Sequence, residues 1–433
     1  MSKLTRRSFV KLTGGAAAVG LTACAGGPSI AGNYKHRVVV IGGGYGGAVA
    51  AKYIRMADPS IKVTLIEKDK YYYSCPLSNW VVAGFRDLEV QKWGYSGLKA
   101  RGVEVVHDKA TKIDAVSQKV TTASGKTFKY DKLVVSPGVG FRDIEGYTGN
   151  AVNKMPHAWK AGPQTTMLAK QLASMKDGDP FIMVAPPNPF RCPPGPYERA
   201  SLVAHYLKKN KPKSKVLILD PKDKFSKFGL FTGGWKKLYG YGTDNSMIEW
   251  VPGGEGGKVT SVDANAMTVY TDMDEFKSSC INIIPAQMAN KIAVDSGLTD
   301  KSGWCPVHLK TFESTMHKGV YVIGDASAAK GLPKSGYAAN SEAKVCASAV
   351  IAALNGKPVP TPSYVNTCYS MLSPDWGISV AAVYKFDPTK PGKIQKVKGA
   401  GGLSSGSAPD FVRKQEALYN ESWYQSIMAD TFG

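Results

Sequence analysis

The chain has 433 residues, of which 43% are hydrophobic and 21% charged, and its formal net charge is +21. This balance is typical of a globular protein and excludes a disordered chain, while 46 glycines without a fixed repeat exclude collagen. The seven cysteines are too few to staple a small scaffold, and at roughly 150 residues per domain the length suggests two or three domains.

The N-terminal residues 1–31 predict an export signal. Residues 5–11 carry a twin arginine and resemble a twin-arginine signal, and the apolar run at 14–23 is too short to span a bilayer. We therefore expect a periplasmic protein. Cys24 ends a stretch that resembles a lipoprotein processing box, so a lipid anchor there is one outcome and plain cleavage near Ala31 is the other.

The positive charge does not indicate nucleic-acid binding. Residues 1–31 hold four basic residues and no acid, so their removal lowers the charge from +21 by four, to +17. The remaining lysines are scattered, with the densest stretch from Lys208 to Lys215, and the sequence has no zinc-finger, basic-zipper or RNA-binding signature. The charge is either a solvated basic surface or a means of attracting an anionic substrate or an acidic partner.

The first predicted element is a strand at residues 36–41, whose sequence HRVVVI is typical of a strand buried on both faces. Gly42, Gly44 and Gly47 follow with G-x-G-x-x-G spacing, and residues 48–56 are predicted to form a helix. In this context the glycines allow a tight turn, close approach of the backbone to a pyrophosphate, and tight packing of the helix. The motif therefore predicts dinucleotide binding.

A second strand is predicted at residues 61–66 and ends at Glu67, 20 residues beyond Gly47. An acid in this position accepts hydrogen bonds from ribose hydroxyls. Two further strand-and-turn segments, 130–138 and 319–325, resemble those of FAD-binding flavoproteins with two dinucleotide folds. The cofactor residues expected in these turns are Ser136, Gly138, Gly324 and Asp325. For the aspartate, a helix N-cap is the alternative.

The middle of the chain predicts a second dinucleotide fold that does not bind NAD. Residues 181–184 and 215–220 have the apolar sequences of two successive strands. Between them, residues 185–196 carry prolines where an NAD-binding turn has glycines. Because proline lacks the N–H donor that would hold a phosphate, we expect the architecture to persist without the nucleotide.

Six cysteines lie beyond the signal, and the sequence alone does not choose among their 15 possible pairings. Cys75 follows the ribose-binding strand; in the flavoproteins that this fold resembles, that region runs beneath the flavin ring, where a cysteine suits either a redox disulfide or a thioether to the flavin. Cys192 lies in the proline-rich turn, Glu198 follows it in a helix predicted at 197–208, and Cys368 lies in the C-terminal part. The cysteines expected to be buried small hydrophobic residues are Cys280, Cys305 and Cys346.

Several segments resemble the flavoprotein subunit of flavocytochrome c sulfide dehydrogenase. They are residues 75–79, 190–201, 303–306, 333–337, 366–370 and 430–433. The resemblance extends from about residue 34 to the end of the chain and is more specific than the glycine turn. One departure is Ser74-Cys75-Pro76, where the family is expected to have Thr-Cys-Tyr; the cysteine itself is kept.

That resemblance implies an α/β fold with two dinucleotide-binding, Rossmann-like domains of the pyridine nucleotide-disulfide reductase type and a C-terminal interface domain. The expected division is an export signal at 1–31, an FAD-binding domain at 32–146 and 285–360, an NAD-like domain without the NAD motif at 147–284, and the interface domain at 361–433.

The resemblance also implies that Cys75 holds FAD covalently, through a thioether to the flavin 8α-methyl group. It implies that Cys192 and Cys368 form a redox-active disulfide over the flavin ring. Glu198 is the candidate acid–base group, and its alternatives are a first-turn helix carboxylate or an ion pair with Arg199 or a lysine. No metal site is expected.

The implied activity is the oxidation of sulfide to sulfur or polysulfide. A thiolate-type nucleophile such as hydrosulfide attacks a disulfide readily. Electrons would pass to a separate c-type cytochrome subunit, since this chain has no C-x-x-C-H sequence.

The sequence leaves two alternative hypotheses for the function. A sulfide:quinone oxidoreductase shares the fold but would need a membrane-facing amphipathic surface, and residues 416–424 carry acids and no basic amphipathic helix. A lipid at Cys24 would weaken that objection. A non-catalytic flavin- or nucleotide-binding scaffold would not need the cysteines.

Overall fold

A computed structural model describes residues 34–433. The predicted export signal at 1–31, with Cys24, lies outside the described residues.

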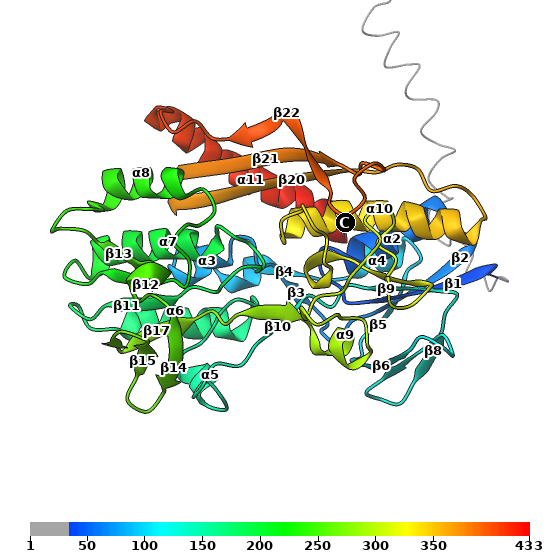
Figure 1. Cartoon of the computed structure of the whole chain (residues 1–433), viewed down its shortest axis with the longest axis horizontal. Helices are drawn as coiled ribbons and strands as arrows, with labels where there is room; N and C mark the ends of the chain where they lie inside the picture. Colours follow the sequence, from blue (N-terminus) through cyan, green and yellow to red (C-terminus); the bar gives the residue numbers. More distant parts are fainter. Residues whose placement is uncertain (1–33) are drawn as a thin grey trace, which may run out of the picture. The chain divides into compact units, whose positions relative to one another are not determined.

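The first dinucleotide fold is built on a five-stranded parallel sheet (Figure 1). Its strands, in spatial order, are β19 (Val320–Val322), β9 (Lys132–Val135), β1 (His36–Ile41), β2 (Ile61–Ile66) and β5 (Glu104–Val106). The predicted strands at 36–41 and 61–66 are present, because their apolar residues are buried on both faces of the sheet. Helix α2 (Gly47–Ala57) covers this sheet together with α10 (Gly336–Leu354).

The second fold has a four-stranded parallel sheet. Its order is β13 (Ile248–Val251), β12 (Val216–Leu219), β11 (Phe181–Val184) and β17 (Cys280–Ile283). Helices α6 (Pro163–Ser174) and α7 (Gly195–Asn210) pack against this sheet, and α8 (Phe228–Tyr239) packs on α7. All four residues of β11, of β12 and of β17 are buried, as the apolar sequences at 181–184 and 215–220 predict.

Two short antiparallel strands connect these folds. The chain leaves the first fold through β10 (Val139–Phe141) and returns through β18 (Gln287–Ala289), which pairs with it. The smaller elements are β3 (Tyr72–Tyr73), β4 (Lys92–Trp93), β6 (Ala110–Asp114), β7 (Lys119–Thr122), β8 (Thr127–Lys129), β14 (Val259–Asp263), β15 (Thr268–Thr271), β16 (Glu275–Lys277), α3 (Ser78–Val82), α4 (Ser96–Ala100), α5 (Ala151–Lys154) and α9 (Lys291–Asp295).

The C-terminal part is an antiparallel sheet with one long helix, drawn in orange and red in Figure 1. It comprises β20 (Ser363–Ser373), β21 (Trp376–Lys385), β22 (Gln395–Leu403) and α11 (Asp410–Phe432). Strand β20 packs against α10 of the first fold and α7 of the second, and α11 lies on β21 and contacts α2. The C-terminal sheet thereby brings Cys368, in the middle of β20, between the two folds.

Candidate active site

The turn between β1 and α2 has room for glycine only. Gly42 has a φ of +95°, and a Cβ there would lie 2.2 Å from the carbonyl oxygen of Ser136. A Cβ on Gly47 would lie 1.8 Å from the carbonyl oxygen of Gly42, and one on Gly44 would touch the ring of Tyr72 at 3.3 Å. The first two distances are far below van der Waals contact, so this turn is a close-packed backbone cradle at the start of a helix, a geometry that binds phosphates.

The acid predicted for ribose binding lies at this turn. One carboxylate oxygen of Glu67 accepts a hydrogen bond from the backbone nitrogen of Gly43 at 2.7 Å, and the other accepts from the nitrogen of Asp69 at 3.0 Å. The side chain is therefore held at the carboxyl end of β2, beside the glycines.

The turns after β9 and β19 lie next to the glycine turn. The backbone nitrogen of Ser136 donates to the carbonyl oxygen of Ile41 at 2.8 Å, and Gly138, with a φ of +69°, has open space around it. Gly324 has a φ of +70°, and its nitrogen donates to a carboxylate oxygen of Glu342 at 2.7 Å. The four cofactor segments predicted from the sequence thus meet at one edge of the first sheet.

Asp325 carries an unused hydrogen-bond acceptor. Its Oδ1 atom is buried and has no hydrogen-bond partner in the described part of the chain, although Lys334 donates to its backbone oxygen at 2.8 Å. Burial raises the pKa of the carboxyl group, and the charges of Arg191 and Lys334 oppose that rise. A buried acceptor without a donor is costly, so a hydroxyl-bearing ligand fits here. Together with the glycine cradle, this atom fits the predicted FAD.

Cys75 lies in the turn after β3, half-buried, with its Sγ 3.7 Å from the carbonyl oxygen of Trp159. Three basic side chains lie within electrostatic reach of this thiol: Lys160, Arg191 and Arg199. Burial lowers the pKa of Lys160 to about 8 and that of Arg199 to about 10. Such a cluster favours an anionic group beside Cys75.

Cys192 and Cys368 meet although they come from different parts of the chain. Cys192 lies in the turn between β11 and α7, with a φ of +92°, and its nitrogen donates to the carbonyl oxygen of Lys334 at 2.8 Å. Both thiols are free, and they interact with one another. That interaction, together with burial, raises the pKa of Cys192; the same contact and the charge of Lys227 lower the pKa of Cys368. The disulfide between them stays a prediction.

Glu198 lies beside the two cysteines in the first turn of α7. Its carboxylate accepts hydrogen bonds from the backbone nitrogen of Met371 at 2.9 Å and from the side-chain nitrogen of Asn79 at 2.8 Å. It forms no ion pair within residues 34–433. Arg199 instead binds Asn79, Asn282 and two backbone oxygens. Burial raises the pKa of Glu198 to about 7, which suits a group that exchanges protons near neutral pH.

Some residues of this site have no sequence motif. They are Trp159, Lys160 and Lys227, which the fold brings to the cysteines from separate loops. Asn79 and Lys334 lie in segments 75–79 and 333–337, which carry the family resemblance, although the sequence predicts no role for either residue. Trp159 lies between the two cysteine regions: its carbonyl contacts Cys75, and its ring would lie 2.7 Å from a Cβ on Gly195. Its indole nitrogen has no hydrogen-bond partner within residues 34–433. A lysine or tryptophan in a loop gives no spacing signal, so only the three-dimensional fold identifies these residues.

In the second fold, the acid that ends β12 is already engaged by the protein. Asp220 accepts hydrogen bonds from Tyr197 at 2.6 Å and Trp250 at 3.1 Å, and it pairs with Lys222 at 2.6 Å. Its place corresponds to that of Glu67 in the first fold. The occupied carboxylate and the prolines of the preceding turn both disfavour a nucleotide at this position.

The other three cysteines are all buried: Cys280, Cys305 and Cys346. Across the described residues, no helix is long and apolar enough to cross a membrane. Nor do residues 34–433 contain a group of three or more His, Cys, Asp or Glu side chains that could hold a metal ion.

Three family models match the chain. Residues 36–167 match pyridine nucleotide-disulphide oxidoreductase, residues 165–285 match the central part of the sulfide dehydrogenase (flavocytochrome c) flavoprotein chain, and residues 360–432 match the flavin-binding part of flavocytochrome c sulphide dehydrogenase. With the parallel sheets, these matches confirm the predicted fold class.

Individual proteins give a consistent picture. The chain is 60% identical over 45 residues to the sulfide dehydrogenase (flavocytochrome c) flavoprotein chain of Chlorobaculum thiosulfatiphilum, covering 10% of this chain and 94% of that sequence. It is 38% identical over 105 residues to the sulfide-quinone reductase of Aquifex aeolicus, covering only 24% of either sequence. The crystal structure of the Aquifex aeolicus sulfide:quinone oxidoreductase aligns with a TM-score of 0.68 at 20% identity, covering 92% of both chains.

Proposed function

Because the chain belongs to the family of the flavocytochrome c sulfide dehydrogenase flavoprotein chain and is an oxidoreductase that acts on sulfide, we propose that it converts hydrosulfide to polysulfide or sulfur and delivers the electrons to a c-type cytochrome subunit. The observation that carries this proposal is the meeting of Cys192, Cys368 and Glu198 beside Cys75 and the dinucleotide cradle.

The residues present fit FAD. The glycine turn would hold the pyrophosphate, Glu67 a ribose, and the unpartnered oxygen of Asp325 a further hydroxyl of the cofactor. Cys75 would tether the flavin, and the cations around it would favour an electron-rich ring. When bound, FAD supplies an acceptor that takes up two electrons and releases them singly.

The two cysteines would open the reaction as a disulfide. Hydrosulfide attacks one sulfur, the S–S bond breaks, and its electron pair passes to the other sulfur, which leaves as a thiolate. The attacked cysteine becomes a persulfide, so the sulfide sulfur has been oxidised and the disulfide reduced. Glu198, whose pKa of about 7 gives both protonation states near neutrality, would hold or release the proton of hydrosulfide at its carboxylate.

The electron acceptor, cytochrome c or quinone, distinguishes the proposed function from the alternative of a sulfide:quinone oxidoreductase. Sulfide:quinone oxidoreductase activity is favoured by one observation: Phe411, Leu418 and Tyr419 on α11 are exposed, as expected of a helix that rests on a membrane. Purified protein is mixed with sulfide and either a soluble cytochrome c or a soluble quinone, and the initial rates of reduction of the two acceptors are compared. We expect cytochrome reduction; reduction of quinone alone would support the alternative.

We further propose that the protein works in the periplasm, exported by the signal at residues 1–31. This proposal is supported by the sequence pattern and suits an enzyme that meets external sulfide. Fractionation of cells that express the full chain, with the arginine pair intact or replaced by lysines, tests it. We expect periplasmic protein only with the arginines; an unchanged distribution would contradict the twin-arginine route.

A further inference from the structure

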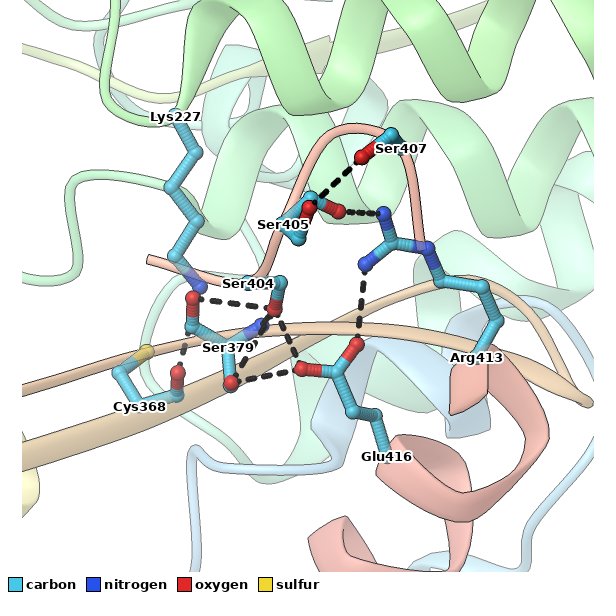
Figure 2. A network of polar contacts seen from close by, with 8 residues as sticks. All are labelled: Lys227, Cys368, Ser379, Ser404, Ser405, Ser407, Arg413 and Glu416. Atoms are coloured by element: carbon cyan, nitrogen blue, oxygen red, sulfur yellow. Dashed lines mark hydrogen bonds and ion pairs between the residues drawn. The ribbon is translucent and has the colours of Figure 1, made fainter. Parts of the chain in front are cut away.

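A lysine ammonium group lies buried beside Cys368. Lys227 is the N-cap residue immediately before α8 and is 7% exposed; its backbone has a φ of +62°, which is rare for a residue with a side chain. This conformation accompanies an inward side chain, which Figure 2 shows extending toward Cys368. Its Nζ atom donates to the carbonyl oxygen of Cys368 at 3.2 Å and to the hydroxyl of Ser370 at 3.1 Å.

The charge of this lysine has no carboxylate partner. Lys227 takes part in no ion pair within residues 34–433, and both of its hydrogen-bond acceptors are neutral. Glu198, the acid of this site, is hydrogen-bonded to Asn79 and Met371 instead, and the charge of Lys227 acts on it from a distance, lowering the pKa of the carboxyl group against the larger effect of burial. Burial raises the pKa of Glu198 to about 7, so near neutral pH this carboxyl group offsets the buried ammonium only in part, and the surroundings of Lys227 are suited to a second anion that forms during the reaction.

Two groups whose charges interact with Lys227 can be anionic, the Glu198 carboxyl group and the Cys368 thiol, and only the thiol gains its charge when a disulfide opens. By contrast, Arg191, the charged neighbour of Cys192, donates to the carbonyl oxygen of Trp159 and lies near Asp325. The two cysteines therefore differ in electrostatic support: a lysine that forms no ion pair faces Cys368, whereas Cys192 adjoins an engaged arginine and the Glu198 carboxyl group, whose charge adds to the rise that Cys368 and burial cause in the pKa of the Cys192 thiol.

Building on the proposed function, we infer that Lys227 is a positioning residue that makes Cys368 the leaving thiolate, so that hydrosulfide attacks Cys192. In this step HS⁻ bonds to the Sγ of Cys192 and the S–S bond breaks. The bonding pair of electrons moves to the Sγ of Cys368, and the proton stays on the new Cys192 persulfide. A thiol with a stabilised anion leaves faster, which gives the disulfide a preferred direction of opening.

The position of the added sulfur tests this directly in the wild-type, flavin-containing full chain. The oxidised protein is mixed with sodium sulfide, quenched with iodoacetamide, and its peptides are analysed by mass spectrometry. We expect an extra sulfur on Cys192 and alkylation of Cys368. The reverse pattern would overturn the inference. If the oxidised protein held no Cys192–Cys368 disulfide to begin with, the proposed function itself would fail, so the two failures are distinguishable.

The role of the lysine is tested on the reduced protein, by the rate of iodoacetamide alkylation of each cysteine against pH. We expect Lys227→Met to move the midpoint of the Cys368 alkylation profile upward by about one pH unit, while Lys227→Arg keeps the midpoint near that of wild type. Lys224→Met, which removes an exposed cation from the same loop, should behave as wild type. An unchanged Cys368 profile in folded Lys227→Met would refute the lysine's role.

Flavin content and circular dichroism establish whether each variant folds. If Lys227→Met does not fold, Lys227→Arg provides the test. Retained alkylation of Cys368 with the extra sulfur on Cys192 would support the inference. An extra sulfur on Cys368, despite the positive charge of the arginine, would contradict it.

Discussion

A carboxylate oxygen of Glu198 accepts a hydrogen bond from the backbone nitrogen of Met371 at 2.9 Å, and this bond joins the first turn of α7 to β20. Helix α7 follows the turn that carries Cys192, and β20 carries Cys368. The same carboxylate also binds Asn79 at 2.8 Å, on the short helix after Cys75. One acid thus ties together the three segments on which the reactive cysteines lie.

The first prediction concerns the pH dependence of stability. The pKa of Glu198 is raised from 4.5 to about 7 by burial, so the folded chain binds this proton more tightly than the unfolded chain. The resulting stabilisation is full below about pH 4.5 and is lost as the pH rises through about 7. Glutamine does not titrate, so Glu198→Gln lacks this pH-dependent loss. As the pH rises from 4.5 to 8, the unfolding free energy of the variant should therefore increase by roughly 3 kcal/mol relative to that of wild type.

Urea unfolding of both proteins at several pH values measures this difference. Equal pH dependence of the two unfolding free energies would contradict the assignment. In activity assays, Glu198→Gln should also lose the pH limb near 7 in kcat, because kcat reports groups of the enzyme–substrate complex, whereas kcat/KM also follows the protonation of free hydrosulfide.

The sequence predicted the parts of this molecule that depend on local pattern. The strands at 36–41, 61–66 and 181–184 follow from unbroken apolar runs, and the glycine turn follows from its spacing. In contrast, Lys227 reaches Cys368 only because β20 crosses between the two folds, and Trp159 reaches Cys75 across 84 residues of chain. Such contacts join residues that are far apart in the chain, and no propensity or spacing encodes them.

The second prediction concerns the flavin tether. If Cys75 holds FAD through a thioether, acid precipitation of the wild-type protein should leave the yellow flavin in the pellet, and Cys75→Ser should release it. The variant should still bind FAD before precipitation, because the glycine turn, Glu67 and Asp325 remain. Absorbance at the flavin band in pellet and supernatant measures both. Complete release from the wild type would disprove the covalent bond.

The third prediction concerns the cysteine pair. Cys192→Ser and Cys368→Ser should each reduce sulfide-dependent cytochrome c reduction to background, since either change removes the disulfide that hydrosulfide opens. Flavin content should stay at the wild-type level. The matched control is Cys346→Ala, which replaces a fully buried cysteine of α10 and should keep its activity. Substantial turnover in both serine variants would mean that sulfide reacts without the pair.

The fourth prediction concerns the glycine cradle. Gly47→Ala places a methyl group 1.8 Å from the carbonyl oxygen of Gly42, a backbone atom that cannot move without opening the turn. We expect loss of bound flavin and a lower melting temperature. Gly229→Ala, in α8, meets no atom within 4 Å and should change neither. Flavin-to-protein absorbance ratios and thermal unfolding compare the two variants, and a wild-type ratio in Gly47→Ala would show that this turn does not hold the cofactor.

The fifth prediction concerns the attachment of α11. Glu416, 8% exposed, accepts hydrogen bonds from the hydroxyls of Ser379 and Ser404 and pairs with Arg413 at 3.0 Å (Figure 2). Glu416→Ala leaves the guanidinium of Arg413 buried without its counter-charge, so we expect a loss of about 3–5 kcal/mol in unfolding free energy. The loss in unfolding free energy should be smaller in the double variant Glu416→Leu with Arg413→Met, which removes both charges and keeps side chains of similar volume.

An exposed acid on the same helix provides the comparison. Glu421 pairs with Arg86 at 2.8 Å, but its side chain is 48% exposed, so Glu421→Ala should cost less than about 1 kcal/mol. Urea unfolding measures all three variants. Equal losses for Glu416→Ala and Glu421→Ala would mean that burial of the Glu416 carboxylate does not anchor α11, because only a buried pair leaves an uncompensated charge when one partner is removed.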